Sequence, residues 1–373
     1  MARRRGPEPV RFAVVGQGYF GQAAVLPAFA QADGCELRAI FSSDESKLRA
    51  LKRKYRVGAA LGYDQYDAYL GSGEIDAVYI ALPNDMHCDY VVRAARAGID
   101  VLCEKPIATN SQDAERMLSA CAESGVKLMV AYRLHFEGAT LDAIDRVRKG
   151  AIGRPRFFSS TFAMQVREDN IRTQREHGGG PLLDIGIYCV NAARAFFRDE
   201  PLEVAALSAR TKGDRRFKEI DEQTSAILKF PDERLAQLTF SFGAYDHSTL
   251  TLVGEKGRLR LDPAYEEASA LVMDVEAANR KPVRKKFAKR DQVAAELVAF
   301  AECVRSGRDP EPSGEEGLAD LRVLEAIQRA IESGRVEKVD AIQRRARPSK
   351  AQEIQRRPHD MPELVHAEPP GQD

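Results

Sequence analysis

The 373-residue sequence has no net charge and no long hydrophobic run, and each absence excludes a class of partner. Its 56 basic residues are balanced by 56 acidic ones, so no overall basic field favours nucleic acid or an anionic membrane. No stretch stays apolar over the ~20 residues that a membrane-spanning helix needs. We therefore expect a protein that binds neither nucleic acid nor membrane.

Cysteine and histidine are too few and too scattered to hold a metal ion. The sequence has 6 cysteines and 6 histidines, with no C-x-x-C pair and no cysteine beside a histidine at ligand spacing. A zinc site needs a close group of such ligands, so we expect no metal and exclude a zinc dehydrogenase. Isolated cysteines are typical of reduced thiols in a cytosolic protein.

The amino-terminal segment has three consecutive arginines but lacks the rest of a secretory signal. Arg3, Arg4 and Arg5 precede a short apolar run at residues 10–15 that leads straight into glycines, whereas a signal would stay apolar and end in small residues. We interpret residues 1–9 as a flexible tail and expect a cytoplasmic protein.

A glycine pattern follows the first apolar run. Residues 11–15 are expected to form a strand buried on both faces, and G-x-G-x-x-G then precedes a helical segment at 23–30. Such glycines allow a tight turn, close approach of the backbone to a pyrophosphate and close helix–strand packing. The alternative is a purely structural turn. We predict that this loop binds the cofactor through Gly16, Gly18, Tyr19, Phe20 and Gly21.

The end of the second predicted strand, at residues 36–41, favours NADP over NAD. An NAD-selective site has a carboxylate there to hold the ribose 2′-hydroxyl, but the strand leads into Ser42 and Ser43, with Lys47 one helical turn further on. Two hydroxyls and an ammonium suit a 2′-phosphate because they donate hydrogen bonds and positive charge. Asp44 is the alternative ribose ligand, although it more simply caps the following helix.

Polar residues also follow the buried strand expected at residues 77–82. Because open α/β sheets bind ligands at the carboxyl ends of their strands, we predict that Leu82, Pro83, Asn84 and His87 line the cofactor crevice. His87 could equally cap the helix that follows it.

A charged pair and a proline end the strand expected at residues 101–104. Pro106 has no N–H for a strand ladder and favours an extended Lys105. Glu104 and Lys105 therefore fall where such a sheet binds its ligand, and we predict that both contact the cofactor and that Lys105 also reaches the substrate. The alternative for Lys105 is an ordinary surface lysine.

A second group of chemical residues lies in the helix expected after the glycines at 178–180. Pro181 suits the first helical position, and Asp184 and Tyr188 then lie on one face, one turn apart. By itself this pattern is more typical of an amphipathic helix with a surface aspartate and a packed tyrosine. Together with Lys105 it favours three groups that converge above a nicotinamide.

Those three groups would supply the proton transfer that accompanies hydride transfer. When hydride leaves a carbinol carbon, a base within hydrogen-bond reach must take the hydroxyl proton. A tyrosine hydroxyl holds its proton too tightly for easy transfer near neutrality, but an ammonium ~4 Å away contributes up to about 4 kcal/mol at an effective dielectric of ~20. Lys105 could thus activate Tyr188 or carry the proton itself, with Asp184 orienting the substrate or the lysine.

The chain is long enough for two domains and a tail. We predict an α/β fold class, with a Rossmann dinucleotide-binding domain at residues 10–135 and an α+β substrate and oligomerisation domain at 136–340. Partial alternation at 235–242 predicts an antiparallel sheet with one covered face in the second domain. We expect this sheet to be large, open and mostly antiparallel. Residues 341–373 form a charged, proline-containing tail, and we expect the last ~30 residues to be disordered or an exchanged arm.

Further elements are expected in the second half of the chain. Strands are predicted at 157–162, 202–209, 225–230, 235–242, 249–253 and 258–261. Helices at 300–304 and 317–333 should pack back on the first domain.

The order of the motifs resembles one known family. The chain carries G-x-G-x-x-G, L-P-N-x-x-H, E-K-P and Y-R-x-H, then G-G-G-P-L-L-D-I-G-I-Y at residues 178–188 and P-S-G-E-E-G at 312–317. Together these are similar to the glucose–fructose oxidoreductase and inositol dehydrogenase (Gfo/Idh/MocA) family, especially its glucose–fructose branch. Residues 170–177 lack the tryptophan expected in that branch, which leaves the substrate open.

The resemblance implies roles for residues at matching positions. Lys105 would be the family's motif lysine, Asp184 its motif aspartate and Tyr188 its proton-donating residue, and Arg172 would match an arginine at the cofactor. The Y-R-x-H motif adds further candidates. We add Arg133 to the predicted cofactor contacts, and Tyr132 and His135 to the predicted substrate contacts alongside Lys105, Asp184 and Tyr188.

The sequence therefore predicts an NADP-dependent oxidoreductase that acts on the CH–OH group of an aldose, a pyranose or a related polyol. An alternative enzyme would keep NADP(H) tightly bound and oxidise one sugar while reducing another. An alternative of another class is a regulatory protein that binds nucleotide without turnover, which the intact Lys105, Asp184 and Tyr188 argue against. The family habit implies a homodimer or homotetramer formed through the C-terminal sheet.

Overall fold

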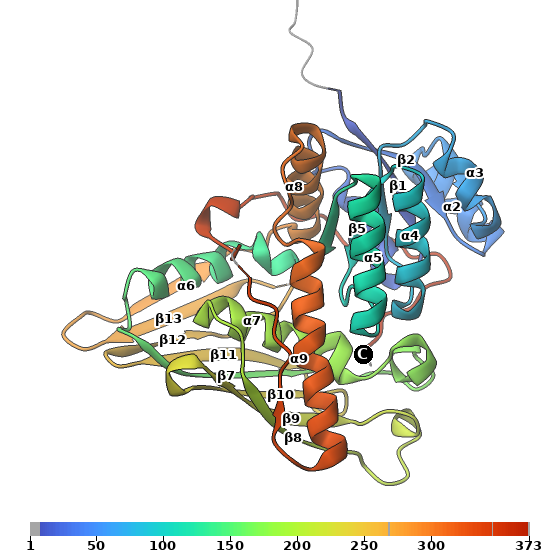
Figure 1. Ribbon diagram of the computed structural model, residues 1–373. Helices are drawn as coiled ribbons and strands as arrows, with labels where there is room; N and C mark the ends of the chain where they lie inside the picture. Colours follow the sequence, from blue (N-terminus) through green and yellow to red (C-terminus); the bar gives the residue numbers. More distant parts are fainter. Residues whose placement is uncertain (1–7, 268, 345, 372–373) are drawn as a thin grey trace, which may run out of the picture.

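The first domain is a parallel sheet with helices on both faces (Figure 1). The computed structural model describes residues 8–267, 269–344 and 346–371. The strands of this sheet are β1 (Val10–Val15), β2 (Cys35–Phe41), β3 (Ala59–Leu61), β4 (Ala77–Ile80), β5 (Asp100–Glu104) and β6 (Leu128–Ala131). They lie in the order β3-β2-β1-β4-β5-β6 and all pair in parallel. The order changes direction between β1 and β4, where such sheets bind dinucleotides.

The helices of this domain follow the strands. They are η1 (Gly21–Val25), α1 (Leu26–Ala28), α2 (Glu45–Tyr55), η2 (Tyr63–Gln65), α3 (Tyr66–Leu70), η3 (Asn84–Met86), α4 (His87–Arg96) and α5 (Ser111–Ser124). Side-chain caps start two of them, because Asp44 accepts a hydrogen bond from the Lys47 amide at 2.9 Å and Asn110 accepts one from the Asp113 amide at 2.9 Å. Each cap satisfies an amide that the helix itself leaves unpaired.

The second domain contains a large sheet. Its strands are β7 (Pro155–Ala163), β8 (Glu203–Ala209), β9 (Gln223–Phe230), β10 (Arg234–Ser241), β11 (His247–Gly254), β12 (Gly257–Leu261), β13 (Leu271–Ala277), β14 (Val283–Phe287) and β15 (Glu337–Lys338). They lie in the order β14-β13-β12-β11-β7-β10-β9-β8-β15. All neighbours recorded with a register are antiparallel except β7 and β10. The expected α/β class, with a Rossmann sheet and a mostly antiparallel second sheet, is confirmed.

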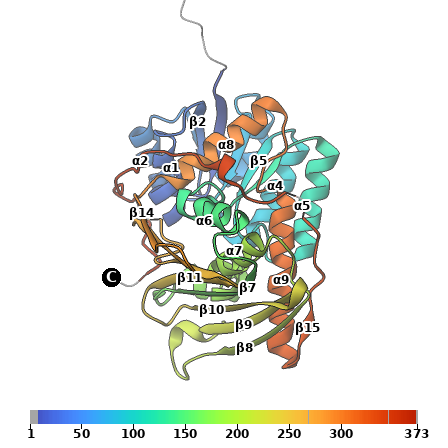
Figure 2. The same cartoon turned by 90° about the vertical axis from the view of Figure 1, so that its left-hand side faces the viewer.

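Helices cover only one face of this sheet (Figure 2). The longer ones are α6 (Gly138–Arg148), α7 (Ile187–Phe197), which continues the π-helical turn η7 (Leu182–Gly186), and α9 (Gly314–Ser333). Shorter turns are η4 (Arg133–His135), η5 (Ile171–Thr173), η6 (Arg175–His177), η8 (Arg215–Phe217), η9 (Pro231–Glu233) and η10 (Lys350–Gln352). Buried and exposed residues alternate along β9 and β10, so the second face remains open.

A buried arginine joins α7 to α9. Arg194 is fully buried, and its guanidinium donates to Glu200 at 2.6 and 2.9 Å, to Glu316 at 2.8 Å and to Asp320 at 2.5 Å. Removing one partner from such a cluster would leave buried charge unpaired, which is costly. The network therefore holds α7, and with it Tyr188, in one position relative to α9.

The structure corrects the sequence-based prediction in two places in the second half of the chain: two strands were missed, and one helix begins earlier than predicted. Strands β13 and β14 were not expected; residues 273–277 of β13 do alternate apolar and polar side chains, whereas β14 is mostly charged and exposed. Helix α8 (Gln292–Ser306) begins at Gln292 rather than at residue 300, since Asp291 caps it by accepting from the Ala294 amide at 2.8 Å. Within the described part of the chain, no helix combines the length and hydrophobicity required to cross a bilayer.

Of the two alternatives for the last ~30 residues, disorder is wrong for those that the structure describes, and the exchanged arm stays a prediction. Arg344 pairs with Glu311 and Glu316, and Arg347 pairs with Glu200 at 2.6 Å. Composition alone suggested disorder, but both arginines find carboxylates on the folded body. The flexible tail predicted at residues 1–9 lies mostly outside the described residues, which begin at residue 8.

Candidate active site

A groove runs along the carboxyl edge of the first sheet. It encloses about 380 Å³. Most residues predicted to bind the cofactor line it: Gly16, Gly18, Tyr19, Phe20, Gly21, Ser42, Ser43, Lys47, Leu82, Pro83, Asn84 and Arg172. Sequence motifs separated by more than 150 positions thus meet in one cavity.

The glycine loop leaves the space that a pyrophosphate needs. Gly16 has φ +103°, and a Cβ added there would lie 2.3 Å from the Ala81 carbonyl oxygen. A Cβ at Gly21 would lie 2.5 Å from the Gly16 oxygen, whereas one at Gly18 would meet nothing within 4 Å. The first and last glycines are therefore required for packing, and Gly18 faces the open groove. This loop fits a dinucleotide phosphate.

The end of β2 presents hydroxyls and an ammonium to the groove. Ser42, Ser43 and Lys47 line it, and partial burial lowers the pKa of Lys47. Asp44 is engaged elsewhere, because one carboxylate oxygen caps α2 and the other lies 2.7 Å from Nδ1 of His366. The capping alternative for Asp44 therefore matches its position in the structure.

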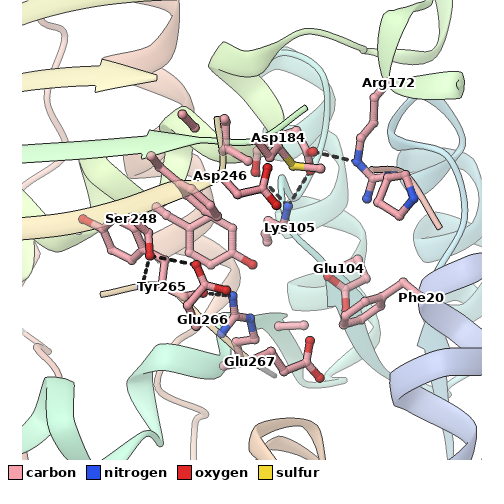
Figure 3. Close-up of a pocket in the computed structure, with 18 of the residues that line it drawn as sticks. Phe20, Glu104, Lys105, Arg172, Asp184, Asp246, Ser248, Tyr265, Glu266 and Glu267 are labelled. Atoms are coloured by element: carbon pink, nitrogen blue, oxygen red, sulfur yellow. Dashed lines mark hydrogen bonds and ion pairs between the residues drawn. The ribbon is translucent and has the colours of Figure 1, made fainter. Parts of the chain in front are cut away.

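A second cavity, of about 680 Å³, adjoins the groove and shares six lining residues with it: Phe20, Ala81, Leu82, Asn84, Arg172 and Asp184. Figure 3 shows Lys105, from the end of β5, pointing at Asp184 in the π-helical turn η7. Lys105 Nζ lies 2.8 Å from Asp184 Oδ1 and 2.8 Å from its backbone oxygen. Arg172 Nε donates to Asp184 Oδ2 at 2.7 Å.

These contacts fix the charges of the pair. Burial alone would raise the pKa of Asp184, but the charges of Arg172 and Lys105 outweigh it and hold the pKa well below its usual range. Burial would lower the pKa of Lys105, but the nearby Asp184 charge reverses this and raises it. Lys105 is therefore an ammonium and Asp184 a carboxylate near neutrality.

Two cations face the ring of Tyr188 in the same cavity. Lys105 Nζ and the Arg133 guanidinium carbon each lie 5.0 Å from its ring centroid. Arg133 is itself held by Gln292 at 2.5 Å and by the Tyr265 carbonyl at 2.6 Å. Lys105, Asp184 and Tyr188, expected to converge, do share one cavity.

Three predicted contact residues lie elsewhere. His87 is fully buried and lines neither cavity, since its ring nitrogens lie 2.9 Å from the Pro106 oxygen and 3.0 Å from the Leu82 oxygen. Its ring ties two strand ends together and does not contact the cofactor groove. Tyr132 and His135 line a small pocket behind Tyr188. His135 Nε2 bonds Asn191 at 2.9 Å, so both residues belong to the packing around α7.

Sequence reasoning missed the acidic wall of the second cavity. Glu266 accepts from the Ser248 hydroxyl at 2.8 Å, and Glu267 and Asp246 lie nearby (Figure 3). These residues come from loops and strand ends of the second sheet and carry no motif. The pairing of the consecutive strands β11 and β12 brings them together, and the packing of the two domains brings them to the cavity.

A pair of carboxyl groups, those of Glu104 and Glu296, also lines this cavity. Tyr79 donates its hydroxyl to Glu104 at 2.5 Å, and Glu296 from α8 is buried with its Oε1 lacking a hydrogen-bond partner among the described residues. Burial raises the pKa of Glu104 to about 7 and raises that of Glu296 as well. Residues 8–267, 269–344 and 346–371 contain no cluster of ligands suited to a metal ion.

Comparison with known families matches both domains. Residues 10–132 match the model of an oxidoreductase family with an NAD-binding Rossmann fold, GFO/IDH/MocA, and residues 140–260 match the GFO/IDH/MocA C-terminal domain. A D-xylose 1-dehydrogenase [NADP(+)] from Haloarcula marismortui is 32% identical over 342 residues, which cover 89% of this chain and 94% of that protein.

Solved structures show the same fold. An aldose–aldose oxidoreductase from Caulobacter crescentus, complexed with glycerol, superposes with a TM-score of 0.85 at 33% identity and covers 89% of this chain and 100% of that one. A 3-ketoreductase from Actinomadura kijaniata, in complex with NADP and TDP-benzene, has a TM-score of 0.79 at 28% identity, with 87% and 98% covered.

The carboxyl pair predicts a pH-dependent stability. Because the folded protein holds the Glu104 proton up to about pH 7 while the free side chain loses it near 4.5, the free energy of unfolding should fall as the pH rises through this range. Glu104→Gln should flatten that fall, measured by urea unfolding between about pH 5 and about pH 8.

The matched control is Glu45→Gln, whose side chain is 86% exposed; it should keep the parent profile. A Glu104→Gln profile that overlays the parent's would contradict the assignment.

Proposed function

This chain belongs to the Gfo/Idh/MocA family of oxidoreductases, and from that premise we propose that it transfers hydride between a sugar CH–OH group and NADP. The observation that carries the proposal is the junction of the two cavities, where Lys105, Asp184 and Tyr188 meet. The bound nicotinamide would accept or return the hydride. Everything else that the reaction requires comes from the chain.

The charges in the site favour different roles for Lys105 and Tyr188. Lys105 is held as an ammonium by Asp184, so it cannot take a proton and instead donates a hydrogen bond to the substrate oxygen. Tyr188 then carries the proton, with Lys105 and Arg133 both beside its ring. Asp184 positions the lysine. Two solved forms of the Actinomadura ketoreductase change a lysine to alanine and a tyrosine to phenylalanine, the same residue types.

The choice of NADP is supported from two directions. Ser42, Ser43 and Lys47 line the groove at the end of β2 without a free carboxylate among them. The similar xylose dehydrogenase is named for NADP(+), and the similar ketoreductase was solved with NADP. The buried, charged Lys105–Asp184 pair argues against a regulatory protein, because nucleotide binding without turnover does not require it.

Self-association through the open face of the large sheet is part of the proposal. Leu207 is 77% exposed, Ile227 50%, Phe157 47% and Leu235 46%, and all lie on neighbouring strands of that sheet. An apolar patch of this kind marks an interaction site. A homodimer, or a dimer of such dimers, would cover it.

A cytoplasmic location completes the proposal. All six cysteines, spread over both domains, are free thiols in the described structure. This usage is typical of a reducing compartment.

Lys105→Ala should lower kcat by about 10³-fold, within the range for loss of a group that assists proton transfer. Affinity for NADP should change little, because the phosphates bind at the glycine loop. Steady-state rates with a panel of aldoses, together with calorimetric titration of NADP, measure both. Lys149→Ala, whose side chain is 68% exposed, is the control. Retained turnover in Lys105→Ala would contradict the proposed mechanism, whereas an absence of turnover in the parent protein as well would favour the regulatory alternative.

Lys47→Ala should weaken NADP binding by roughly 10-fold or more, the value of a charge-assisted hydrogen bond. NAD binding should be nearly unchanged, because NAD lacks the 2′-phosphate. Titration of both nucleotides compares the two effects. Lys52→Ala, an exposed lysine on the same helix, is the control. An equal loss for both nucleotides would place the 2′-phosphate elsewhere.

Leu207→Lys combined with Ile227→Lys should convert the assembly into monomers, because two charges would be buried in the proposed interface. Size-exclusion chromatography with light scattering measures the mass. Tyr245→Lys, at a residue that is 88% exposed in a loop, should leave the mass unchanged. An unaltered mass in the double variant would show that another surface associates.

A further inference from the structure

The end of the chain crosses from one domain to the other over the cofactor groove. We call residues 359–371 the C-terminal strap. Figure 2 shows this red segment passing α1 and α2 and then descending to the large sheet, where the chain ends. It lies beyond residues 10–132 and 140–260, the two ranges that the family models match.

The strap is anchored first on the helix that follows the glycine loop. The Gln22 side chain accepts from the Val365 amide at 2.8 Å and donates to the Val365 oxygen at 2.9 Å. Gln22 is 1% exposed and directly follows Gly21. His359 lies 2.9 Å from the Ala23 oxygen through Nε2 and 2.8 Å from Asp291 through Nδ1.

A second group of anchors lies at the adenosine end of the groove. His366 Nδ1 is 2.7 Å from Asp44 Oδ2, at the junction of β2 and α2. Lys54, on the same helix, donates to the Glu363 carbonyl at 2.6 Å. The strap is thus held next to Ser42, Ser43 and Lys47.

The last anchors lie on the second domain, beside the end of β7. Arg167 Nη1 donates to Glu368 at 2.9 Å, and the Arg167 amide donates to the Pro370 oxygen at 2.9 Å. Gly371 forms an antiparallel bridge with Val166. Between His366, which contacts the first domain, and Glu368, which contacts Arg167, the strap therefore passes from the first domain to the second.

The residues between these anchors form part of the cavity walls. Glu368 lines the groove together with the glycine loop and Lys47. Pro370 lines the adjoining cavity that contains Lys105 and Tyr188. A dinucleotide lying along the groove would therefore sit beneath the strap, and its release would require the strap to detach at one end.

We propose that the C-terminal strap retains NADP(H) through successive turnovers. The inference rests on the proposed function, and it selects the reaction in which one sugar is oxidised and a second is reduced on the same cofactor. The first sugar gives up a hydride and a proton and the second takes up both, so the cycle balances with no free nucleotide. Only the sugars need to enter and leave the cavity.

The test uses the full-length chain and the double variant Arg167→Ala/His366→Ala, which removes one anchor on each domain. Both proteins are loaded with NADPH and desalted. The fluorescence of the bound nucleotide is then followed after addition of excess NADP, and the nucleotide that remains is identified by mass spectrometry after denaturation. Arg215→Ala, an exposed arginine paired with Glu168 on the same side of the second domain, is the control.

The parent and Arg215→Ala should retain nucleotide through desalting. The double variant should release NADPH at least ~10-fold faster, because loss of the anchors changes the rate constant of dissociation more than that of association. Equal release from all three proteins would overturn the strap proposal. Circular dichroism verifies that the double variant is folded. If it is not, the single variant His366→Ala, at an exposed side chain, provides the same comparison, and an unchanged release rate there also counts against the strap.

Activity separates this proposal from the function on which it rests. With NADP in excess, the double variant should oxidise sugar at the parent rate or faster. Without added nucleotide, only the parent and the control should convert a pair of sugars into one oxidised and one reduced product, measured by NMR. Failure of all proteins to turn over sugar would refute the proposed function, whereas the release rates would still decide whether the strap retains nucleotide.

Discussion

The ion pair between Lys105 and Asp184 is the constraint on which the arrangement of the site depends. It joins the carboxyl end of a strand in the first domain to the start of a helix in the second, at 2.8 Å and largely out of water. A buried carboxylate without its cations would be costly, so the pair and Arg172 couple the correct placement of the two domains to the correct charge of the site. The contact with Asp184 that raises the pKa of Lys105 also brings Tyr188 into the same cavity.

The helix that carries Asp184 and Tyr188 is held from behind by a separate polar network. Arg194 and Asn191 on α7 share Glu316 and Asp320 on α9. His135, one of the residues expected at the substrate, is instead a member of this network through Asn191. This buried histidine belongs to the framework around the site and lines neither the groove nor the larger cavity. The same is true of His87, which links two strand ends beside Lys105.

The C-terminal strap and the wall of acidic residues are both formed by parts of the chain without recognisable motifs. The strap is rich in charged and proline residues, and its composition resembles that of a disordered segment. Its backbone and histidines nevertheless find partners on both domains. Glu104 and Glu296, from a strand and a distant helix, form a shielded carboxyl pair only because α8 returns to pack on the first sheet.

The amino-acid sequence by itself determined the elements whose signals are local. The glycine loop, the strand that stops at Lys105-Pro106 and the helix with Asp184 and Tyr188 one turn apart each follow from short-range rules of backbone geometry and periodicity. Only the tertiary structure decided which polar residues face a cavity. His87, Tyr132 and His135 carry the same local signals as true lining residues, but burial and hydrogen bonding turn them away from the cofactor groove and the substrate cavity. Glu266, Glu267 and the strap carry no local signal at all. The strap's position depends on contacts with segments about 200 to 340 residues away, and that of Glu266 depends on strand β11 and helix α8; no local pattern encodes either.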